Sequence, residues 1–524
     1  MIAARESPYL RHLIIAGEIG LFFVAVIFTM RKLSKSKLIA FRQCPKRLWL
    51  ELKKPGLIDD SGSQAAFNIG NQVGDIAQRV FDPDGTGINV DPIDIGWDES
   101  AAQTEALLQT GKGLIFEALF SIPGSLAIAD IMLPDFASAA LRWQMIEVKS
   151  STSVKDYHRD DVAIQTYIAQ RSGLALSKVG VAHINNQFIY PGDENYDGLL
   201  HVEDLTEEAK GRHAEVELWI ADAQSTAAQE VEPIIKIGGH CREPFTCGFY
   251  DYCRKDVTQP EIPTNILPRI HTAKVSDWER RGITELHDTP DDELNLIQQR
   301  VKAATLSGET YFDAVGAATA LGAQATHTYF LDFETVTFPV PIWKGTRPYQ
   351  QLPFQYSLHL VHKSGGLRHT EFLDTSGDDP RKALAEQLIQ DCGNDGVIFA
   401  YNAGFEKGVL KSLAESFPEY TSQLNSIIRR LDDLLPIARD CYYHPSQKGS
   451  WSLKAVLPAI SELRYSDLEE VQNGMAAVVA YKEAINSDTT PERKQELRDR
   501  MLEYCKLDTY ATVEMWKFFK GTIK

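Results

Sequence analysis

The sequence predicts an α/β protein built from more than one domain. A chain of 524 residues exceeds one ordinary core, and at roughly 100 to 200 residues per domain it divides into about three. Two apolar stretches, WQMIEVKS and TYFLDFETV, are typical of strands that carry acidic residues, and each is followed by segments with helical spacing. With 44% hydrophobic and 24% charged residues the chain is a globular protein, not a disordered or fibrous one.

The net charge of -18 excludes a surface that is basic throughout. A nucleic-acid enzyme of this charge must concentrate its cations locally, and the early part of the chain contains one such cluster. Two interpretations remain open for it, a solvated helix face and a set of phosphate contacts. The cluster consists of Arg31, Lys32, Lys35, Lys37, Arg42, Lys46, Arg47, Lys53 and Lys54.

Residues 1–29 form an apolar N-terminal extension. Its uninterrupted apolar part, residues 19–29, is shorter than the roughly 20 residues that a membrane span needs, and Glu18 precedes it. We expect translation to start at Met30, which would make the extension a gene-model artefact, so that the protein is cytoplasmic without stable membrane association. The alternative is an N-terminal anchor on a membrane-bound regulator.

Several helices are expected in the first half. Residues 38–52 have helical spacing, with a break or a helix start at Pro45. Residues 67–81 form a second amphipathic pattern, and residues 202–228 predict an exposed helix. After the WQMIEVKS strand, Asp160 or Asp161 is expected to cap a further helix.

The first candidate site lies on two strands. Side chains alternate along a strand, so Glu147 and Lys149 point the same way, and Asp130 lies about one strand earlier. Two carboxylates can hold a divalent cation that polarises a phosphate and activates water, while the lysine neutralises charge on the phosphorus. Gln165, on the helix that follows, is close enough to assist. These residues predict a metal-dependent phosphodiesterase.

The seven cysteines divide into two sets. Cys392, Cys441 and Cys505 are scattered, as expected of small buried apolar residues. The other four favour metal binding because no secretory signature supports disulfides, and they suit an iron–sulfur cluster or an all-cysteine zinc site. Their spacing favours a cluster, although His240 leaves zinc possible. This second set is Cys44, Cys241, Cys247 and Cys253.

In this order, residues 31–255 resemble the RecB-like PD-(D/E)XK nucleases of the iron–sulfur type. The resemblance implies Asp130 and Glu147 as metal ligands, Lys149 as the catalytic lysine and Gln165 as the helix glutamine. It also implies that the four cysteines hold a 4Fe-4S cluster. Two positions depart from the pattern: Gln78 stands where many relatives have a histidine, and Ala169 stands where an aromatic residue is expected, with Tyr167 displaced.

The second candidate site draws on three separate elements. Asp332 and Glu334 share one face of a strand, Glu406 lies in the first turn of a helix, and Tyr504 and Asp508 lie four residues apart on the last helix. That helix is expected to open at Thr490-Pro491. Buried same-face acids require a cation or a partner, and a two-metal site needs such a constellation.

These motifs resemble the DnaQ-like, ribonuclease H-fold DEDD exonucleases of the tyrosine subtype. The resemblance implies that Asp332, Glu334 and Asp508 bind two Mg or Mn ions and that Tyr504 orients the attacking water. Glu406 stands where an aspartate is expected, and Asp432 and Asp433 are nearby alternatives. With the stretches PFQYSLH and GSWSLKAVLPAI, the chain resembles the bacterial family called domain of unknown function 2779, in which this domain follows a RecB-like one.

The predicted organisation is an extension over residues 1–29, a PD-(D/E)XK nuclease domain over 30–255, a helical linker over 256–325 and a ribonuclease H-like mixed-sheet exonuclease domain over 326–524. We expect the linker to be a plain helical spacer, and the alternative is a helix-hairpin-helix module, which the pattern around Gly282-Ile283 resembles. We expect an Mg- or Mn-dependent DNA exonuclease with two hydrolytic sites, acting on single-stranded or end-containing DNA in repair, recombination or defence. The alternative is a nucleic-acid-binding scaffold with one or both sites inactive and a structural metal cluster.

Overall fold

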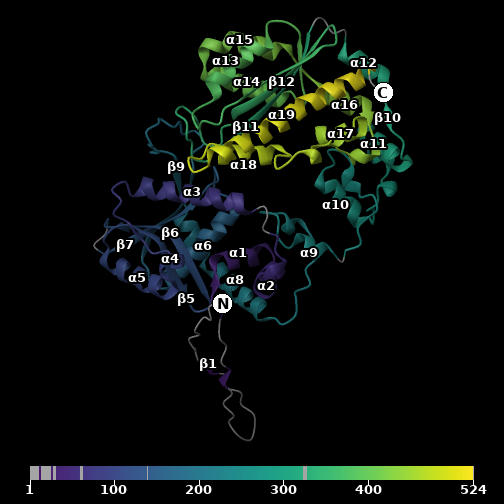
Figure 1. Cartoon of the computed structure of the whole chain (residues 1–524). Coiled ribbons are helices and arrows are strands. Elements are labelled where there is room, and N and C mark those ends of the chain that lie inside the picture. Colours follow the sequence, from purple (N-terminus) through teal and green to yellow (C-terminus); the bar gives the residue numbers. More distant parts are fainter. Residues whose placement is uncertain are drawn as a thin grey trace. The chain divides into compact units, whose positions relative to one another are not determined.

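The chain forms two compact mixed α/β units, described by a computed structural model (Figure 1). Unit 1 comprises Met1–Val257 and Phe338–Tyr349, and unit 2 comprises Thr258–Thr337 and Gln350–Lys524. No helix in the described part of the chain is long and apolar enough to cross a membrane. The residues described are 11–12, 25–26, 31–59, 63–137, 140–255, 257–322 and 327–522.

Most of the N-terminal extension lies outside the described residues. Within it, β1 (Arg11–His12) pairs antiparallel with β2 (Ala25–Val26). The predicted start of translation at Met30 and the alternative of an anchor therefore fall on residues that the structure does not describe.

Unit 1 is built on a seven-stranded sheet in the order β4-β5-β6-β7-β8-β9, with β3 beside β6. Strands β5 to β7 are antiparallel neighbours, whereas β7 and β8 are parallel and are joined by the crossover helix α6 (Asp156–Arg171). The strands are β3 (Leu33–Ser34), β4 (Ile88–Asn89), β5 (Ile115–Ile122), β6 (Ser125–Asp135), β7 (Arg142–Lys149), β8 (Leu176–Ile184) and β9 (Leu200–Asp204).

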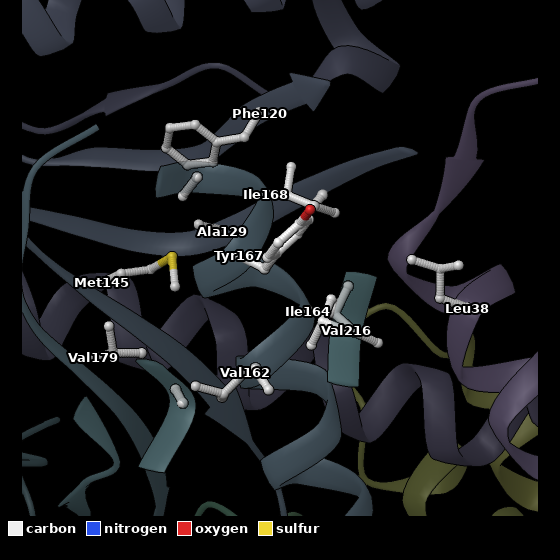
Figure 2. Packing of buried hydrophobic residues seen from close by; sticks show 14 of the residues in the cluster. Leu38, Phe120, Ala129, Met145, Val162, Ile164, Tyr167, Ile168, Val179 and Val216 are labelled. Carbon is white, nitrogen blue, oxygen red and sulfur yellow. The ribbon is translucent and has the colours of Figure 1, made fainter. Parts of the chain in front are cut away.

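Helix α6 packs its apolar side chains against this sheet. Val162, Ile164 and Ile168 are fully buried together with Met145 of β7 and Val179 of β8. Figure 2 shows this cluster with two further helices contributing, through Leu38 and Val216. Both strands of the parallel pair, β7 and β8, share one core with the crossover helix α6. This close packing fixes the positions of β6, β7 and α6 relative to one another.

The remaining helices of unit 1 agree in part with the sequence predictions. The chain breaks at Cys44 and restarts at Pro45, as predicted, but the expected helix over residues 202–228 is wrong at its start because residues 200–204 pair with β8. The helices are α1 (Lys35–Gln43), α2 (Pro45–Lys53), α3 (Ser63–Phe81), α4 (Pro92–Ile95), α5 (Trp97–Thr110), α7 (Thr206–Gly211), α8 (His213–Ala228) and α9 (Tyr250–Arg254).

Acids from distant elements neutralise most of the early basic cluster. Arg42 pairs with Asp160 and its guanidinium lies 4.0 Å from the ring centroid of Trp219, which indicates a packed structural role. Phosphate contacts by the whole cluster are therefore not supported. The other pairs are Lys35 with Glu147 and Asp161, Lys37 and Arg47 with Glu51, and Lys46 and Lys54 with Glu232.

A segment of unit 1 comes from the connection between two strands of unit 2. Val340 packs in a cluster with Val73 of α3 and Ile184 of β8, and the backbone of Thr346 accepts a hydrogen bond from the N–H of Tyr190. The hydroxyl of Tyr349 donates to the carbonyl of Ser150, immediately after the β7 lysine. Residues 338–349 thus complete an apolar cluster of unit 1.

Unit 2 contains a five-stranded sheet in the order β13-β12-β11-β14-β15. Strands β13, β12 and β11 are antiparallel neighbours, and β11, β14 and β15 are parallel. The strands are β11 (His327–Val336), β12 (Leu352–His362), β13 (Leu367–Leu373), β14 (Val397–Ala400) and β15 (Leu431–Asp433).

Helices cover both faces of this sheet. Alternate residues of β11 enter different cores, so Phe330 packs with Trp516 of α19 while Leu331 packs with Leu384 of α13. The long helix α19, yellow in Figure 1, runs along β11 and β12. The helices that pack on the sheet are α13 (Arg381–Cys392), α14 (Gly404–Ser416), α15 (Thr421–Arg430) and α19 (Pro491–Phe519).

Shorter elements complete unit 2. Around Gly282 the chain does not form the helix-hairpin-helix alternative, because this glycine is followed by a bridge between Glu285 and Pro263 and by 3-10 turns, and the next α-helix starts only at Leu296. Residues 258–322 belong to unit 2 as a helical region. The elements are α10 (Thr272–Arg280), α11 (Leu296–Ser307), β10 (Tyr311–Phe312), α12 (Ala314–Leu321), α16 (Leu434–Cys441), β16 (Tyr442–Tyr443), α17 (Leu453–Ile460) and α18 (Gly474–Ala484).

Candidate functional sites

The structure brings together the four predicted acidic-site residues of unit 1. Asp130 lies in the middle of β6 and its Oδ2 accepts the backbone N–H of Val148 at 2.6 Å. On β7, Lys149 Nζ lies 2.6 Å from Glu147 Oε1. From α6, Gln165 Nε2 donates to Glu147 Oε2 at 2.6 Å. Both oxygens of this carboxylate are therefore fixed in position.

Two further residues join this site that the sequence interpretation did not include. Asp161 is one helical turn before Gln165 on α6, and its Oδ2 lies 2.6 Å from Lys149 Nζ. The prediction that it caps the helix is wrong, because α6 starts at Asp156 with Lys155 at the N-cap. Lys35, the first residue of α1, places its Nζ 2.7 Å from Glu147 Oε1.

Glu117 adds a further carboxylate, from β5. Its backbone has φ 57°, a left-handed conformation that is rare for a residue with a side chain, and it interrupts the pairing of β5 with β6 opposite Asp130. Burial, with the neighbouring charge of Asp130, raises the Glu117 pKa to about 8. A lone acid in the apolar run IFEALF was the only sequence signal for this residue.

The charges at this site are unequally compensated. Burial, and then the charge of Glu147, raises the Asp130 pKa to about 7. Burial also acts to raise the pKa of Glu147, but the ammonium groups of Lys149 and Lys35 outweigh it and hold that pKa below its usual range. Asp130 and Glu117 are therefore the groups whose ionisation a bound cation would favour.

Gln78 and Ala169, the two positions that depart from the predicted pattern, make no hydrogen bond with the acidic residues of this site in the described part of the chain. Tyr167 is buried in the unit 1 core (Figure 2), where its ring meets that of His213 edge-on at 5.5 Å, and Ala169 is buried in the same core. Gln78 is half-buried on α3.

The four predicted cysteines line one pocket of unit 1. Cys44 lies between α1 and α2, whereas Cys241, Cys247 and Cys253 come from the last described segment of residues 1–257. Burial, together with the neighbouring cysteines, raises the pKa of the Cys247 and Cys253 thiols. Since these groups lie close enough to perturb one another, a cation is the ligand that would stabilise their thiolate forms.

Within the described residues, no three of these four sulfurs lie within 4.8 Å of one another. Zinc holds each sulfur at about 2.3 Å, so four ligands of one ion come within roughly 4 Å of one another. Among the described residues, the only trio of ligand atoms that all lie within 4.8 Å of one another is Asp332, Glu334 and Asp508. His240, whose Nε2 lies 3.5 Å from Cys241 Sγ, lines the pocket as a further nitrogen donor.

This same trio forms the acidic site of unit 2. Asp332 and Glu334 lie on β11 and Asp508 lies on α19, which is capped by Thr490 before Pro491 as predicted. Burial, with the charges of its neighbours, raises the Asp332 pKa well above its usual value and the Glu334 pKa to about 8. A cation bound beside these carboxylates would therefore favour their ionised forms.

Glu406 lies near this trio without joining it. It is 2% exposed, and its Oε2 has no hydrogen-bond partner within the described structure. Burial raises its pKa to about 8, and its charge acts on Asp332. The alternatives are less suitable, because Asp433 accepts the N–H groups of Asn402 and Leu435 as a helix cap, and Asp432 is exposed.

Two tyrosines hydrogen-bond Asp508. Tyr504 was predicted, and Tyr465, which was not, donates its hydroxyl to Asp508 Oδ1. Burial raises the Asp508 pKa to about 6 even though both hydroxyl groups act to lower it. Tyr465 lies in a 3-10 turn between α17 and α18, where its sequence context carried no catalytic pattern.

Lys454 and Cys505 also border the trio. Lys454 Nζ lies 4.8 Å from the ring centroid of Tyr465 and 5.3 Å from that of Tyr504. Cys505 Sγ lies 3.7 Å from Asp332 Oδ2, so this cysteine contacts the acidic site and is not merely a core residue. Cys392 and Cys441 are buried in apolar clusters, as predicted.

Residues 329–452 match the family model Domain of unknown function (DUF2779). The DUF2779 match begins in β11 and ends before α17, so it contains Asp332, Glu334 and Glu406, whereas Tyr504 and Asp508 lie beyond it. No curated protein matches the chain.

The acids of the DUF2779 segment predict a pH-dependent stability. The Glu334 pKa is about 8 in the folded protein and near 4.5 when exposed, so the folded state holds a proton that the unfolded state releases. Metal-free protein should therefore lose a few kcal/mol of stability as pH rises from about 4.5 to 8, and Mg²⁺ should restore more of it at the higher pH. Calorimetry with EDTA or Mg²⁺ checks this, and a metal-free unfolding temperature that rises over this range would contradict it.

Proposed function

We propose that the chain is a metal-dependent nuclease with one hydrolytic site in each unit. The observation that carries the proposal is the trio of half-buried to buried carboxylates Asp332, Glu334 and Asp508, whose ligand oxygens lie within 4.8 Å of one another. Close buried carboxylates are costly unless a cation binds them, and cations held by carboxylates are typical of enzymes that cleave phosphodiesters. The sheet order of unit 2, with an antiparallel edge and a parallel edge, supports a ribonuclease H-like fold of the DEDD type.

In unit 2 the position of each site residue suggests its role in hydrolysis. Asp332, Glu334 and Asp508 would hold Mg or Mn ions, and Glu406, with its unpartnered Oε2, would bind an ion-bound water. Bound ions would polarise the scissile phosphate and lower the pKa of the attacking water. Tyr504 would orient that water through its hydroxyl, while Lys454 would neutralise charge on the phosphate.

In unit 1 the sheet and its crossover helix support a PD-(D/E)XK fold. Asp130 and Glu147 would hold a divalent cation, and Glu117 supplies a third carboxylate beside them. Lys149 would stabilise charge that develops on the phosphate, and Gln165 keeps Glu147 oriented.

We propose a 4Fe-4S cluster as the group held by Cys44, Cys241, Cys247 and Cys253, with zinc as the alternative. Support comes from the all-cysteine donor set and from sulfurs that are not gathered around one point. Its role is structural, because the cysteines join the first helices to the last segment of residues 1–257.

The proposed substrate is single-stranded or end-containing DNA, and the proposed location is the cytoplasm. Both proposals rest on the resemblance to end-directed nucleases, together with the local placement of lysines at otherwise acidic sites.

The test is digestion of end-labelled single- and double-stranded DNA and RNA by the full chain with Mg²⁺ or Mn²⁺. Lys149→Ala should silence unit 1 and Asp332→Ala unit 2, while Lys178→Ala, an exposed lysine on β8, should change neither. If the Lys149 and Asp332 changes together leave all cleavage intact, the site assignment is wrong. If the unchanged chain binds DNA without cleaving it, the protein is a nucleic-acid-binding scaffold.

A further inference from the structure

We propose that Lys35 is a second catalytic lysine of the unit 1 site. Its ammonium group competes with the divalent cation for Glu147 Oε1 and contacts the substrate phosphate once the cation is bound. The inference rests on the proposed function of unit 1, which assigned a role to Lys149 alone.

The geometry places two ammonium groups on one carboxylate oxygen. Lys35 Nζ lies 2.7 Å and Lys149 Nζ 2.6 Å from Glu147 Oε1. Asp161 bridges the same two lysines, with Oδ1 3.3 Å from Lys35 and Oδ2 2.6 Å from Lys149. The two lysines therefore form a matched pair around Glu147 and Asp161.

In this arrangement the two ammonium groups and a bound cation would compete for the Glu147 carboxylate. Glu147 Oε2 already accepts from Gln165 and Oε1 already accepts from both lysines, so a cation bound by this carboxylate would have to compete with these donors. Like charges this close repel by several kcal/mol even at an effective dielectric constant of about 20. Asp161 gives both lysines a second partner, so they can leave Oε1 without leaving the site.

A lysine displaced in this way is suited to bind phosphate. An ammonium group has three donors and no acceptor, and Asp161 uses only part of this capacity. The side chain of Lys35 is 17% exposed and that of Lys149 22%, so both reach the surface where a substrate must enter.

Helix α1 links Lys35 to the segment that carries the cysteines. Lys35 begins α1, whose nine residues span about 13 Å, and Gln43 ends it. The Gln43 amide donates to the carbonyl of His240, just before Cys241, and to those of Glu243 and Phe245, within the loop between Cys241 and Cys247. A shift of that loop moves α1 and with it the second lysine.

The experiment measures Mn²⁺ affinity by electron paramagnetic resonance, in the full chain carrying Asp332→Asn so that the unit 2 site is impaired. Lys35→Met should strengthen Mn²⁺ binding by about tenfold or more, because it removes a competing charge. The same change should slow DNA cleavage by unit 1 by on the order of 100-fold. A lysine that only supported the structure would weaken both.

Matched variants keep the test decisive. Lys35→Arg retains the charge and should have nearly the Mn²⁺ affinity of the parent protein. Lys37→Met changes another lysine of α1 and removes its ion pair with Glu51 of α2, and it should alter neither measurement. Gln43→Leu should act in the direction of Lys35→Met, less strongly and without adding to it.

Each outcome separates the two proposals. Unchanged or weaker Mn²⁺ binding in Lys35→Met overturns the role of Lys35 and leaves the unit 1 site standing. A parent protein in which Lys149→Ala, Asp130→Asn and Glu147→Gln alter neither Mn²⁺ binding nor cleavage overturns the proposed function of unit 1 itself.

Discussion

Replacing Asp332 with asparagine is expected to lower cleavage by unit 2 by about 10³-fold while raising the unfolding temperature of the metal-free protein. Burial and the charges of Asp508 and Glu334 raise the Asp332 pKa, so its ionisation opposes folding when no cation is bound. Asparagine has nearly the same shape and carries no charge. Activity and metal-free stability should therefore move in opposite directions at this residue.

The measurements are digestion of end-labelled DNA in a Lys149→Ala background, which isolates unit 2, and calorimetry in EDTA at about pH 8. The matched control is Asp432→Asn, since Asp432 is exposed on β15 of the same sheet and its Oδ1 accepts a backbone N–H that asparagine can also satisfy. A loss of stability in Asp332→Asn, with or without loss of cleavage, would show that the carboxylate is needed for packing and not for a cation.

Removal of the metal group that we propose for the four cysteines is expected to lower the unfolding temperature of unit 1 by about 10 °C or more. The first helices also contact the segment carrying Cys247 through the Gln43 amide, the hydrogen bond from Lys54 to Tyr252 and the packing of Trp49 on Phe249, and we expect these contacts to be insufficient without the metal group. Cys247→Ser should lose the bound group and expose this segment. Iron and zinc content, visible absorption and the calorimetric transition of unit 1 measure the effect.

The control for this change is Cys441→Ala, which alters a buried cysteine in unit 2 outside the pocket. Its metal content and unit 1 transition should match those of the parent protein. A colourless parent protein with stoichiometric zinc would reject the iron–sulfur assignment, and a Cys247→Ser protein that melts normally would reject a structural role for either metal.

Local patterns predicted the elements that carry the sites. Asp332 and Glu334 share a strand face because the period of a strand is two, and Lys149 approaches Glu147 for the same reason. Thr490 before Pro491 marked the start of α19, since a cap followed by proline is a local signal. These features depend on neighbouring residues, so the sequence alone predicts them.

The missed residues reach their sites through tertiary packing. Lys35 arrives on a helix that is 112 positions from its partner Glu147, and Tyr465 is 43 positions from Asp508. Asp161 was misassigned as a helix cap because the start of α6 at Asp156 lacks a strong capping residue. No spacing rule links such residues, and their proximity follows only from the assembled sheets.

The segment 338–349 restricts how this protein can be divided. It supplies Val340 to an apolar cluster with α3 and β8, and its Tyr349 hydroxyl binds the carbonyl of Ser150. A protein truncated after residue 257 would lack the segment 338–349. A protein starting at residue 258 would contain this segment without the residues of unit 1 on which it packs. We therefore expect that neither unit can be exchanged for another domain by a single cut between them, and that the two units are inherited together.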